Sequence, residues 1–187
     1  MAEPTRERIL EAALACVARL GMARTTMEDI AKEAARSRAT LYRTFPGGRE
    51  ELLDALVTWE VARFFVRLSD AIEPEGLDLG EVLERGLIAA RDALEHHELL
   101  QRLLREEADQ LVPSLATVMP LVVAALADWF RPLVEAAPLR PGVEPAEASE
   151  LVARLALSYL GTPGRWDLHD PEAVHRLVHR HLLAALV

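Results

Sequence analysis

Three short segments with a helical apolar pattern, each bounded by capping residues, occupy the first 45 residues and constrain the fold more than any other feature. Apolar residues recur at three- and four-residue steps over residues 6–20, and Gly21 suits the left-handed conformation that ends many helices. Thr26 can cap a second helix, and Ser37 can cap a third over roughly 38–45. The pattern therefore predicts three short helices with a three-residue turn before the third.

The remaining residues continue the helical pattern in longer segments. A segment from about residue 50 to 69 is apolar on much of its circumference, which indicates a helix shared between two cores. Five further helices are predicted, separated by breaks rich in Pro and Gly, over residues 79–94, 97–110, 113–136, 145–160 and 171–186. Ala and Leu abound and alternating strand patterns are missing. We therefore expect an all-α protein of about nine helices.

Charge is distributed unevenly along the 187 residues, although the formal net charge is -9. Residues 1–49 hold nine Arg and Lys against six Asp and Glu, which is a net charge of +3. Residues 50–187 hold twelve against twenty-four, which is -12. The asymmetry favours a basic domain over 1–49 that can approach phosphate and an acidic helical body over 50–187, with the helix at about 50–69 linking the two.

The third predicted helix has an apolar rear face and a polar front face. Leu41 and Phe45 stand four residues apart and would pack against the first two helices. The side chains that remain free include Arg38, Tyr42 and Arg43. Arg pairs bidentately with guanine, and hydroxyl groups suit phosphates or base edges, so this arrangement indicates a helix-turn-helix that reads the major groove.

The order and spacing of many individual residues support this interpretation. The positions are Arg8-Ile9-Leu10-Glu11-Ala12-Ala13, Gly21, Thr25-Thr26, Asp29-Ile30-Ala31, Ser37, Thr40-Leu41-Tyr42 and Phe45. Over residues 6–56 they resemble the DNA-binding domain of the TetR family of transcriptional regulators. Two positions depart from the family pattern. The turn reads Ala35-Arg36-Ser37 where Gly-Val-Ser is usual, so a positive φ at Ala35 would carry strain of about 1 kcal/mol. Thr44 replaces a frequent His, which puts one phosphate contact in doubt.

The resemblance implies a sequence-specific DNA-binding regulator, and repression is the family's usual mode. We expect the residues that contact operator DNA to be Thr25, Thr26, Ser37, Arg38, Ala39, Thr40, Tyr42, Arg43 and Arg49. Among these, the threonines at the start of the second helix and Arg49 at the start of the fourth are candidate phosphate clamps.

The resemblance also implies a C-terminal domain that senses a small molecule and forms a homodimer through its last two helices. Two apolar stripes favour that dimer: Val152, Leu155, Ala156, Tyr159 and Leu160 on one helix, and Val174, Leu177, Val178, Leu182 and Ala185 on the next. In the alternative, both stripes pack inward within one subunit.

A ligand pocket is expected among the helices predicted between residues 50 and 136. Its candidate walls are Trp59, Leu87, Leu100, Leu103, Leu104, Met119, Val122, Leu126 and Trp129, which favour a small hydrophobic or aromatic effector that releases the protein from its operator. For each single residue, plain core is the favoured alternative to a ligand contact.

Other kinds of site receive little support from the sequence. The single Cys16 excludes an internal disulfide and any multi-cysteine metal site. His175 and His179 stand four apart with His181 nearby, a spacing that can hold a metal. A third ligand is not evident from the sequence, so we predict a surface or interface role for these histidines, without metal or cofactor.

Other classes of protein are disfavoured as well. The longest apolar stretch, 115–127, is shorter than the roughly 20 residues of a membrane span, so a cytoplasmic protein without a membrane partner is expected. Motifs of nucleophilic or phosphate-binding enzymes are missing, so an enzyme is the least favoured class. A helical dimeric protein-interaction module without DNA binding is the main alternative, and Thr40, Tyr42 and Arg43 argue against it.

Overall fold

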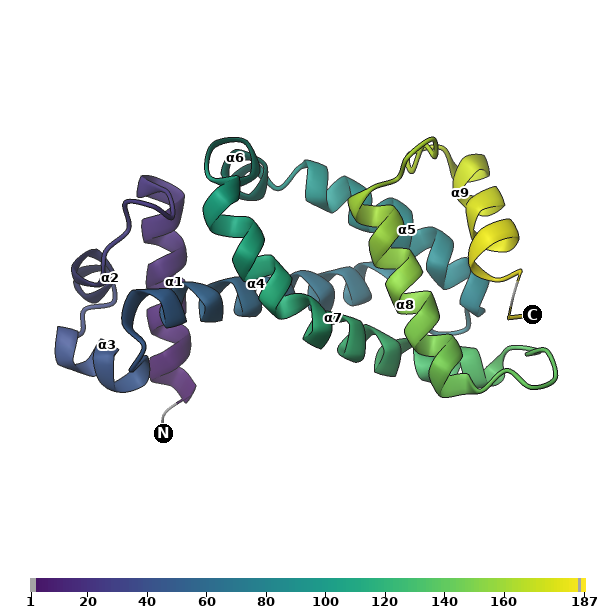
Figure 1. The fold of residues 1–187 in the computed structure, drawn as a ribbon, viewed down its shortest axis with the longest axis horizontal. Coiled ribbons are helices and arrows are strands. Elements are labelled where there is room, and N and C mark those ends of the chain that lie inside the picture. Colours follow the sequence, from purple (N-terminus) through teal and green to yellow (C-terminus); the bar gives the residue numbers. More distant parts are fainter. Residues whose placement is uncertain (1–2, 185) are drawn as a thin grey trace. The chain divides into compact units, whose positions relative to one another are not determined.

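The computed structural model describes residues 3–184 and 186–187, so Ala185 of the second stripe lies outside the described residues. Within this part of the chain all regular structure is helical, and the predicted fold class with nine α-helices is confirmed (Figure 1). The helices are α1 (Glu3–Leu20), α2 (Met27–Glu33), α3 (Arg38–Thr44), α4 (Gly48–Ile72), α5 (Leu79–Glu95), α6 (Glu98–Glu106), α7 (Ala108–Ala136), α8 (Pro145–Gly161) and α9 (Pro171–Leu177), followed by a π-helical segment, η1 (Val178–Leu182).

The chain divides into two compact units. The first comprises the residues up to Arg63 together with His97–Met119, and the second comprises Phe64–His96 together with Pro120–Val187. The long helices α4 and α7 therefore contribute residues to both units. The first unit contains α6 and the beginning of α7 in addition to the three short helices, which is more than the domain expected over residues 1–49.

In the first unit, α1 and α3 both pack against α2. Ile9 and Leu10 of α1, Ile30 of α2 and Leu41 of α3 are fully buried, and Phe45 is nearly so. Helices of seven residues are unstable in isolation, so α2 and α3 depend on this packing and on their caps.

The turn between α2 and α3 has the strained conformation that the sequence suggested. Ala35 has a φ of 50°, in the left-handed region that L-residues other than Asn and Asp rarely adopt. Its amide donates to the carbonyl of Lys32, and the amide of Arg36 donates to the carbonyl of Ala31 at 3.0 Å. These two hydrogen bonds end α2 and reverse the chain toward Ser37, the cap of α3.

In the second unit, α5 packs against α8, α9 and η1 (Figure 1). These elements and the second half of α7 contribute to one apolar core. Its buried side chains include Leu83 of α5, Val152 of α8, Leu177 of α9, and Val178 and Leu182 of η1. The apolar stripes predicted on the last two helices thus both contribute to the interior of one chain. This is the arrangement expected in the alternative in which both stripes pack inward within one subunit.

Two helix boundaries differ from those predicted. We expected a helix to begin at Pro113, because this proline was interpreted as a break between two helices. In the structure α6 ends at Glu106 and α7 begins at Ala108, so Pro113 lies inside a helix. Its missing amide would have bonded to the carbonyl of Asp109. Both residues are exposed, so water can satisfy that carbonyl.

The last predicted helix is also irregular. Instead of continuing from 171 to 186, α9 changes to π geometry at Val178, where the amide of Leu183 donates to the carbonyl five residues earlier at 2.9 Å. Single-turn π segments of this kind often occur at functional sites.

One helix among the described residues, α7, is long and apolar enough to cross a membrane by length and composition. The expectation that no segment is long enough to span a membrane rested on the apolar stretch 115–127, which lies within this longer helix. Such a helix also occurs in soluble helical proteins, and the pattern alone is weak support for a membrane span.

Candidate DNA-binding surface

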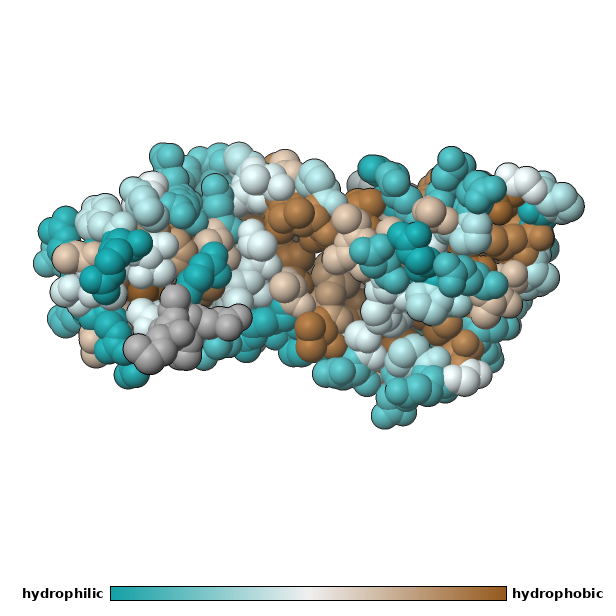
Figure 2. Space-filling model, turned by 90° about the horizontal axis from the view of Figure 1, so that it is seen from below, coloured by the Kyte–Doolittle hydropathy of each residue, from teal (hydrophilic) through white to brown (hydrophobic). Residues whose placement is uncertain are grey.

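The two faces of α3 differ as the sequence predicted. Leu41 is fully buried and Phe45 is 1% exposed, whereas Tyr42 is 44% exposed and Arg38 and Arg43 are exposed as well. The surface over the N-terminal helices, at the left of Figure 2, is mainly hydrophilic. The helix thus holds its cationic and hydroxyl groups away from the core that positions it.

Ser37, Ala39 and Thr40 belong to the first turn of this helix. The Ser37 hydroxyl accepts a hydrogen bond of 3.1 Å from the Thr40 amide, and the two hydroxyl oxygens lie 3.0 Å apart. Ser37 and Ala39 are exposed and Thr40 is partly exposed. The turn therefore presents small groups and two hydroxyls that are already oriented by the cap.

The guanidinium of Arg38 forms a weak ion pair within the protein. It lies 3.9 Å from the Glu28 carboxylate of α2, and both side chains are mostly exposed. An exposed pair at that distance contributes little to stability. The pair therefore leaves Arg38 able to exchange Glu28 for a phosphate or a base.

The predicted capping box at the start of α2 is present. The Thr26 hydroxyl accepts from the Asp29 amide at 3.2 Å and donates to the Asp29 carboxylate at 2.6 Å, while the Thr26 amide donates to the same carboxylate. These hydrogen bonds, the side-chain one foremost, lower the pKa of the Asp29 carboxyl from its ordinary value. Thr26 is exposed, but its hydroxyl is committed to holding the helix end.

Thr25 does not belong to the surface, which corrects its assignment as a phosphate clamp. Its side chain is fully buried, and its hydroxyl donates to the carbonyl of Gly21 at 2.7 Å. The hydroxyl thereby stabilises the turn between α1 and α2. The sequence could not distinguish adjacent threonines of which one faces inward.

The placement of Arg49 also differs from the expected phosphate clamp. Its guanidinium donates to the backbone carbonyls of Met22, Ala23 and Thr25, and the Nε–oxygen distance to Thr25 is 2.8 Å. Arg49 therefore ties the start of α4 to the turn before α2. Its hydrogen-bonding capacity is largely used inside the protein, so we correct its role to that of a positioning residue.

Two residues that the sequence analysis did not single out connect α6 to α1 and the following turn, within the first unit. Arg102 donates to the carbonyl of Val17 at 3.0 Å, and the Glu107 carboxylate accepts from the Ala23 amide at 2.6 Å. The two residues in each contact are more than 80 positions apart in the chain, so no local sequence signal indicates these contacts.

The residues proposed for a ligand pocket are distributed over both units. Trp59, Leu100, Leu103, Leu104 and Met119 belong to the first, and Leu87, Val122, Leu126 and Trp129 to the second. Leu103, Leu87 and Val122 are buried. The Arg63 guanidinium covers the Trp59 ring at 4.3 Å from its centroid.

Most residues proposed for the dimer interface are enclosed within one chain. Val152, Leu177, Val178 and Leu182 are fully buried, and Ala156 is 9% exposed. Their side chains already fill the core of the second unit and leave almost no surface for a partner, so their assignment to the interface is corrected. Leu155 and Tyr159 are only partly buried.

Comparison with known proteins identifies the family. Residues 9–56 match the family described as bacterial regulatory proteins, tetR family. An HTH-type transcriptional regulator of Mycobacterium tuberculosis, described as uncharacterized, is 31% identical over 194 residues, covering 99% of this chain and 76% of the relative. The chain belongs to the TetR family. As a TetR-family protein it is a DNA-binding, helix-turn-helix transcriptional regulator and not an enzyme, and operator DNA and a small-molecule effector are the partners that the family implies.

Solved structures share the whole TetR-family fold. The Rhodococcus erythropolis transcriptional repressor QsdR of the TetR family superposes with a TM-score of 0.67 at 21% identity, covering 97% of this chain and 95% of that one. SmeT, solved as a complex with triclosan, superposes with a TM-score of 0.57 at 26% identity, covering 98% and 92%. The likeness extends well beyond the N-terminal residues that carry the family motif.

Proposed function

We propose that this protein is a cytoplasmic TetR-family repressor that reads its operator with α3 and releases it when a small hydrophobic or aromatic molecule binds. The proposal that α3 reads the operator rests on one observation, which is that this helix has a buried apolar face and an exposed polar face. Leu41 is buried beneath the helix, while Arg38 and Arg43 are exposed on it. Arginine is the side chain best suited to guanine edges in the major groove.

The other surface groups of α3 fit the supporting contacts. Ser37, Thr40 and Tyr42 carry hydroxyls that can donate to phosphate oxygens and fix the register of the helix on the duplex. Ala39 is small enough to allow close approach to a base edge. The net charge of +3 over residues 1–49 attracts the DNA backbone to this end of the chain.

We propose a homodimer as the DNA-binding form, because a helix-turn-helix dimer can occupy two half-sites of a palindromic operator. The outer face of α8 is the surface we assign to the second copy. Leu151 is 41% exposed, and Leu155 and Tyr159 follow at four-residue steps and are partly exposed. Three apolar side chains in one row on a helix surface suit a helix-to-helix contact.

The class of effector is inferred from the apolar character of the candidate walls. Trp59, Leu126 and Trp129 are partly exposed, and the last two pack against the apolar core of the second unit. SmeT, whose structure is similar to this one, has been solved as a complex with triclosan. An apolar wall with aromatic groups favours a hydrophobic or aromatic ligand.

The test of DNA reading is selection of bound duplexes from a random pool by the purified full-length protein, followed by sequencing. We expect a palindromic sequence whose affinity falls steeply with salt concentration, because phosphate contacts release counterions. A pool that shows no enriched sequence, with binding no tighter than to bulk DNA, would contradict the proposal.

The effector part is tested on the selected operator. A panel of apolar aromatic compounds and matched polar analogues is added to the complex, and release is followed by fluorescence anisotropy of labelled DNA. We expect release by members of the apolar set only. Release by the polar analogues alone would overturn the effector class and leave the DNA-reading assignment intact.

A further inference from the structure

Two histidines lie side by side at the C-terminal end of the second unit. His175 is in α9 and His179 is in η1, four residues later, so both project from one face of a continuous helical segment. Their ring centroids are 4.3 Å apart. The π geometry begins at Val178, which lies between the two histidines in the sequence. His179 therefore belongs to the π-helical segment.

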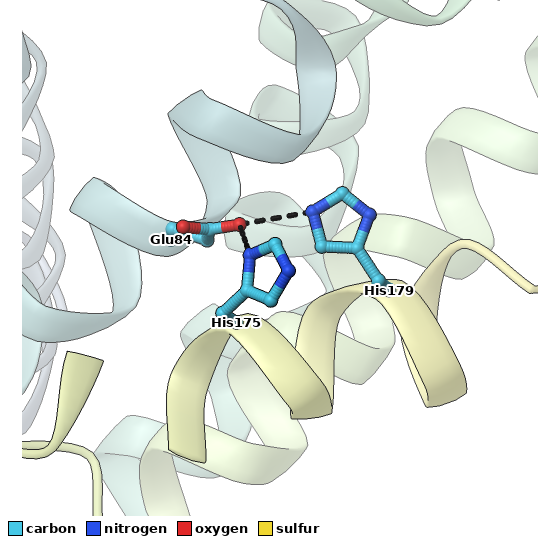
Figure 3. Close-up of side chains that lie close together, drawn as sticks. All are labelled: Glu84, His175 and His179. Carbon is cyan, nitrogen blue, oxygen red and sulfur yellow. Dashed lines mark hydrogen bonds and ion pairs between the residues drawn. The ribbon is translucent and has the colours of Figure 1, made fainter. Parts of the chain in front are cut away.

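A carboxylate from a distant helix converges on the same point. One oxygen of Glu84 in α5, Oε1, lies 2.8 Å from Nδ1 of His175 and 2.9 Å from Nε2 of His179 (Figure 3). Three donor atoms from two packed elements therefore meet at one position, all within 4.8 Å of one another.

The backbone of α5 is shaped to admit the second ring. Gly80 lies one turn before Glu84, and a Cβ at this position would lie 3.0 Å from Cε1 and 3.3 Å from Nε2 of His179. Any larger residue would press on the imidazole. Gly80 thus allows His179 to lie against the helix that carries Glu84.

Two imidazole nitrogens and a carboxylate oxygen form a donor set that Zn²⁺ favours, and three protein ligands leave a coordination position open for water. Ligand atoms at about 2.0–2.1 Å from a tetrahedral ion are about 3.3 Å from one another. The observed separations of 2.8 and 2.9 Å need to widen by about half an ångström, which rotation of exposed side chains provides. Both histidines are exposed, so an ion and its water have a path to the site.

We propose that Glu84, His175 and His179 bind a divalent first-row transition-metal ion of the zinc type. The ion would join α5 to the last helical segment and hold the C-terminal end of the second unit in place. This site is separate from the DNA-reading helix, so the proposal does not depend on how the operator is recognised.

The test uses untagged full-length protein, because a histidine tag would itself bind the metal, after dialysis against a chelator. Zn²⁺ is titrated in by calorimetry, and the melting temperature is recorded with and without the ion. We expect saturable binding of one equivalent and a higher melting temperature, since the ion binds the folded state. Co²⁺, used as a spectroscopic probe, should give visible absorption bands of a low-coordinate nitrogen–oxygen site.

Substitutions separate this site from adventitious binding. His175→Ala, His179→Ala and Glu84→Gln should each weaken Zn²⁺ binding at least about tenfold, and Gly80→Ala should weaken it by displacing the ring of His179. The matched control is His169→Ala, which removes another histidine–carboxylate pair, His169 Nε2 to Glu95 Oε2 at 2.8 Å. Among the described residues no second histidine joins that pair, so its loss should leave the affinity for Zn²⁺ unchanged.

Circular dichroism of each variant checks that the fold is retained, and Glu84→Gln serves where a histidine variant fails to fold. Absence of saturable Zn²⁺ binding by the wild type would overturn the proposal. Affinity that is equal in the wild type and in folded His175→Ala and Glu84→Gln would overturn it as well, because the cluster would then be only a hydrogen-bonded contact between helices.

Discussion

The carboxylate of Glu107 occupies the space that a side chain at Gly21 would need. Gly21 has a φ of 85°, and a Cβ added there would overlap the Glu107 carboxylate, which also accepts the 2.6 Å hydrogen bond from Ala23. Glu107, which lies between α6 and α7, therefore stabilises the turn that follows α1. This contact and that of Arg102 with Val17 lie within the first unit and hold the helix-turn-helix to α6.

Glu107→Ala should lower the stability of the first unit by about 1 kcal/mol, because the Ala23 amide loses a charged acceptor. The neighbouring exposed Glu106→Ala is the control and should change stability by less than about 0.5 kcal/mol. Urea unfolding of the two variants beside the wild type measures the difference. Equal midpoints would show that the carboxylate contributes nothing in solution.

Ala35→Gly should stabilise the protein by about 0.5–1 kcal/mol, since glycine adopts the φ of 50° without the strain that the alanine methyl causes. Ala39→Gly is the matched control, because Ala39 is exposed in α3 and the same exchange there should destabilise by up to about 1 kcal/mol. The measurement is the urea midpoint. Destabilisation by both exchanges would mean that the turn is not strained in solution.

Arg43→Ala should leave the melting temperature nearly unchanged, because exposed substitutions shift stability by less than about 0.5 kcal/mol. If Arg43 reads a base, operator binding should weaken by about 1–3 kcal/mol and specificity should relax at one position. If it contacts only phosphate, binding should weaken evenly across sequences and the salt dependence should decrease.

Leu41→Ala supplies the comparison for Arg43→Ala. Leu41 is fully buried, so its truncation should cost about 2–5 kcal/mol of stability and impair DNA binding only through folding. Operator binding and thermal unfolding are measured on both variants. A Leu41→Ala protein with unchanged stability would refute the orientation of α3.

Leu151→Glu should convert the proposed dimer to monomer with little loss of stability, because Leu151 is 41% exposed in the single chain. Val66→Glu, at a position that is 61% exposed on α4, is the control and should remain dimeric. Leu177→Glu should instead unfold the second unit, since it buries an unpaired charge in the core. Light scattering of the wild type at micromolar concentration must first show a dimer. A monomeric wild type would contradict the proposed interface on α8.

The capping box should make stability depend on pH in the acid range. The Asp29 pKa is lower in the folded chain than its ordinary value of 3.8, so its contribution is fully present above about pH 4 and is lost as the pH falls through the folded-state pKa. Asp29→Asn, which does not titrate, should flatten this part of the stability curve. Urea midpoints measured below pH 5 test the difference, and parallel curves for the two proteins would contradict it.

Local patterns predicted the first 45 residues well because their determinants are local. Caps, turn residues and apolar spacing act within four residues of one another, and the caps at Thr26 and Ser37 and the positive φ of Ala35 followed from them. The prediction at Pro113 was wrong because proline often marks a break between helices, yet here it lies inside α7.

Contacts between distant segments could not be derived in this way. Glu84 meets His175 across 91 residues, and no spacing rule joins a glutamate to histidines of another helix. Likewise, an apolar stripe has the same sequence pattern whether it packs inward or against a second chain, so Val152 and Leu177 were assigned to an interface although they are core.

The two seven-residue helices of the helix-turn-helix have a consequence for the thermodynamics of recognition. Because their caps and buried contacts order α2 and α3 within the free protein, the reading surface exists before DNA arrives. Association then requires no coupled folding of this region, and the heat-capacity change of binding reflects the surface removed from water between protein and DNA. Calorimetry at several temperatures would therefore report the size of that contact directly.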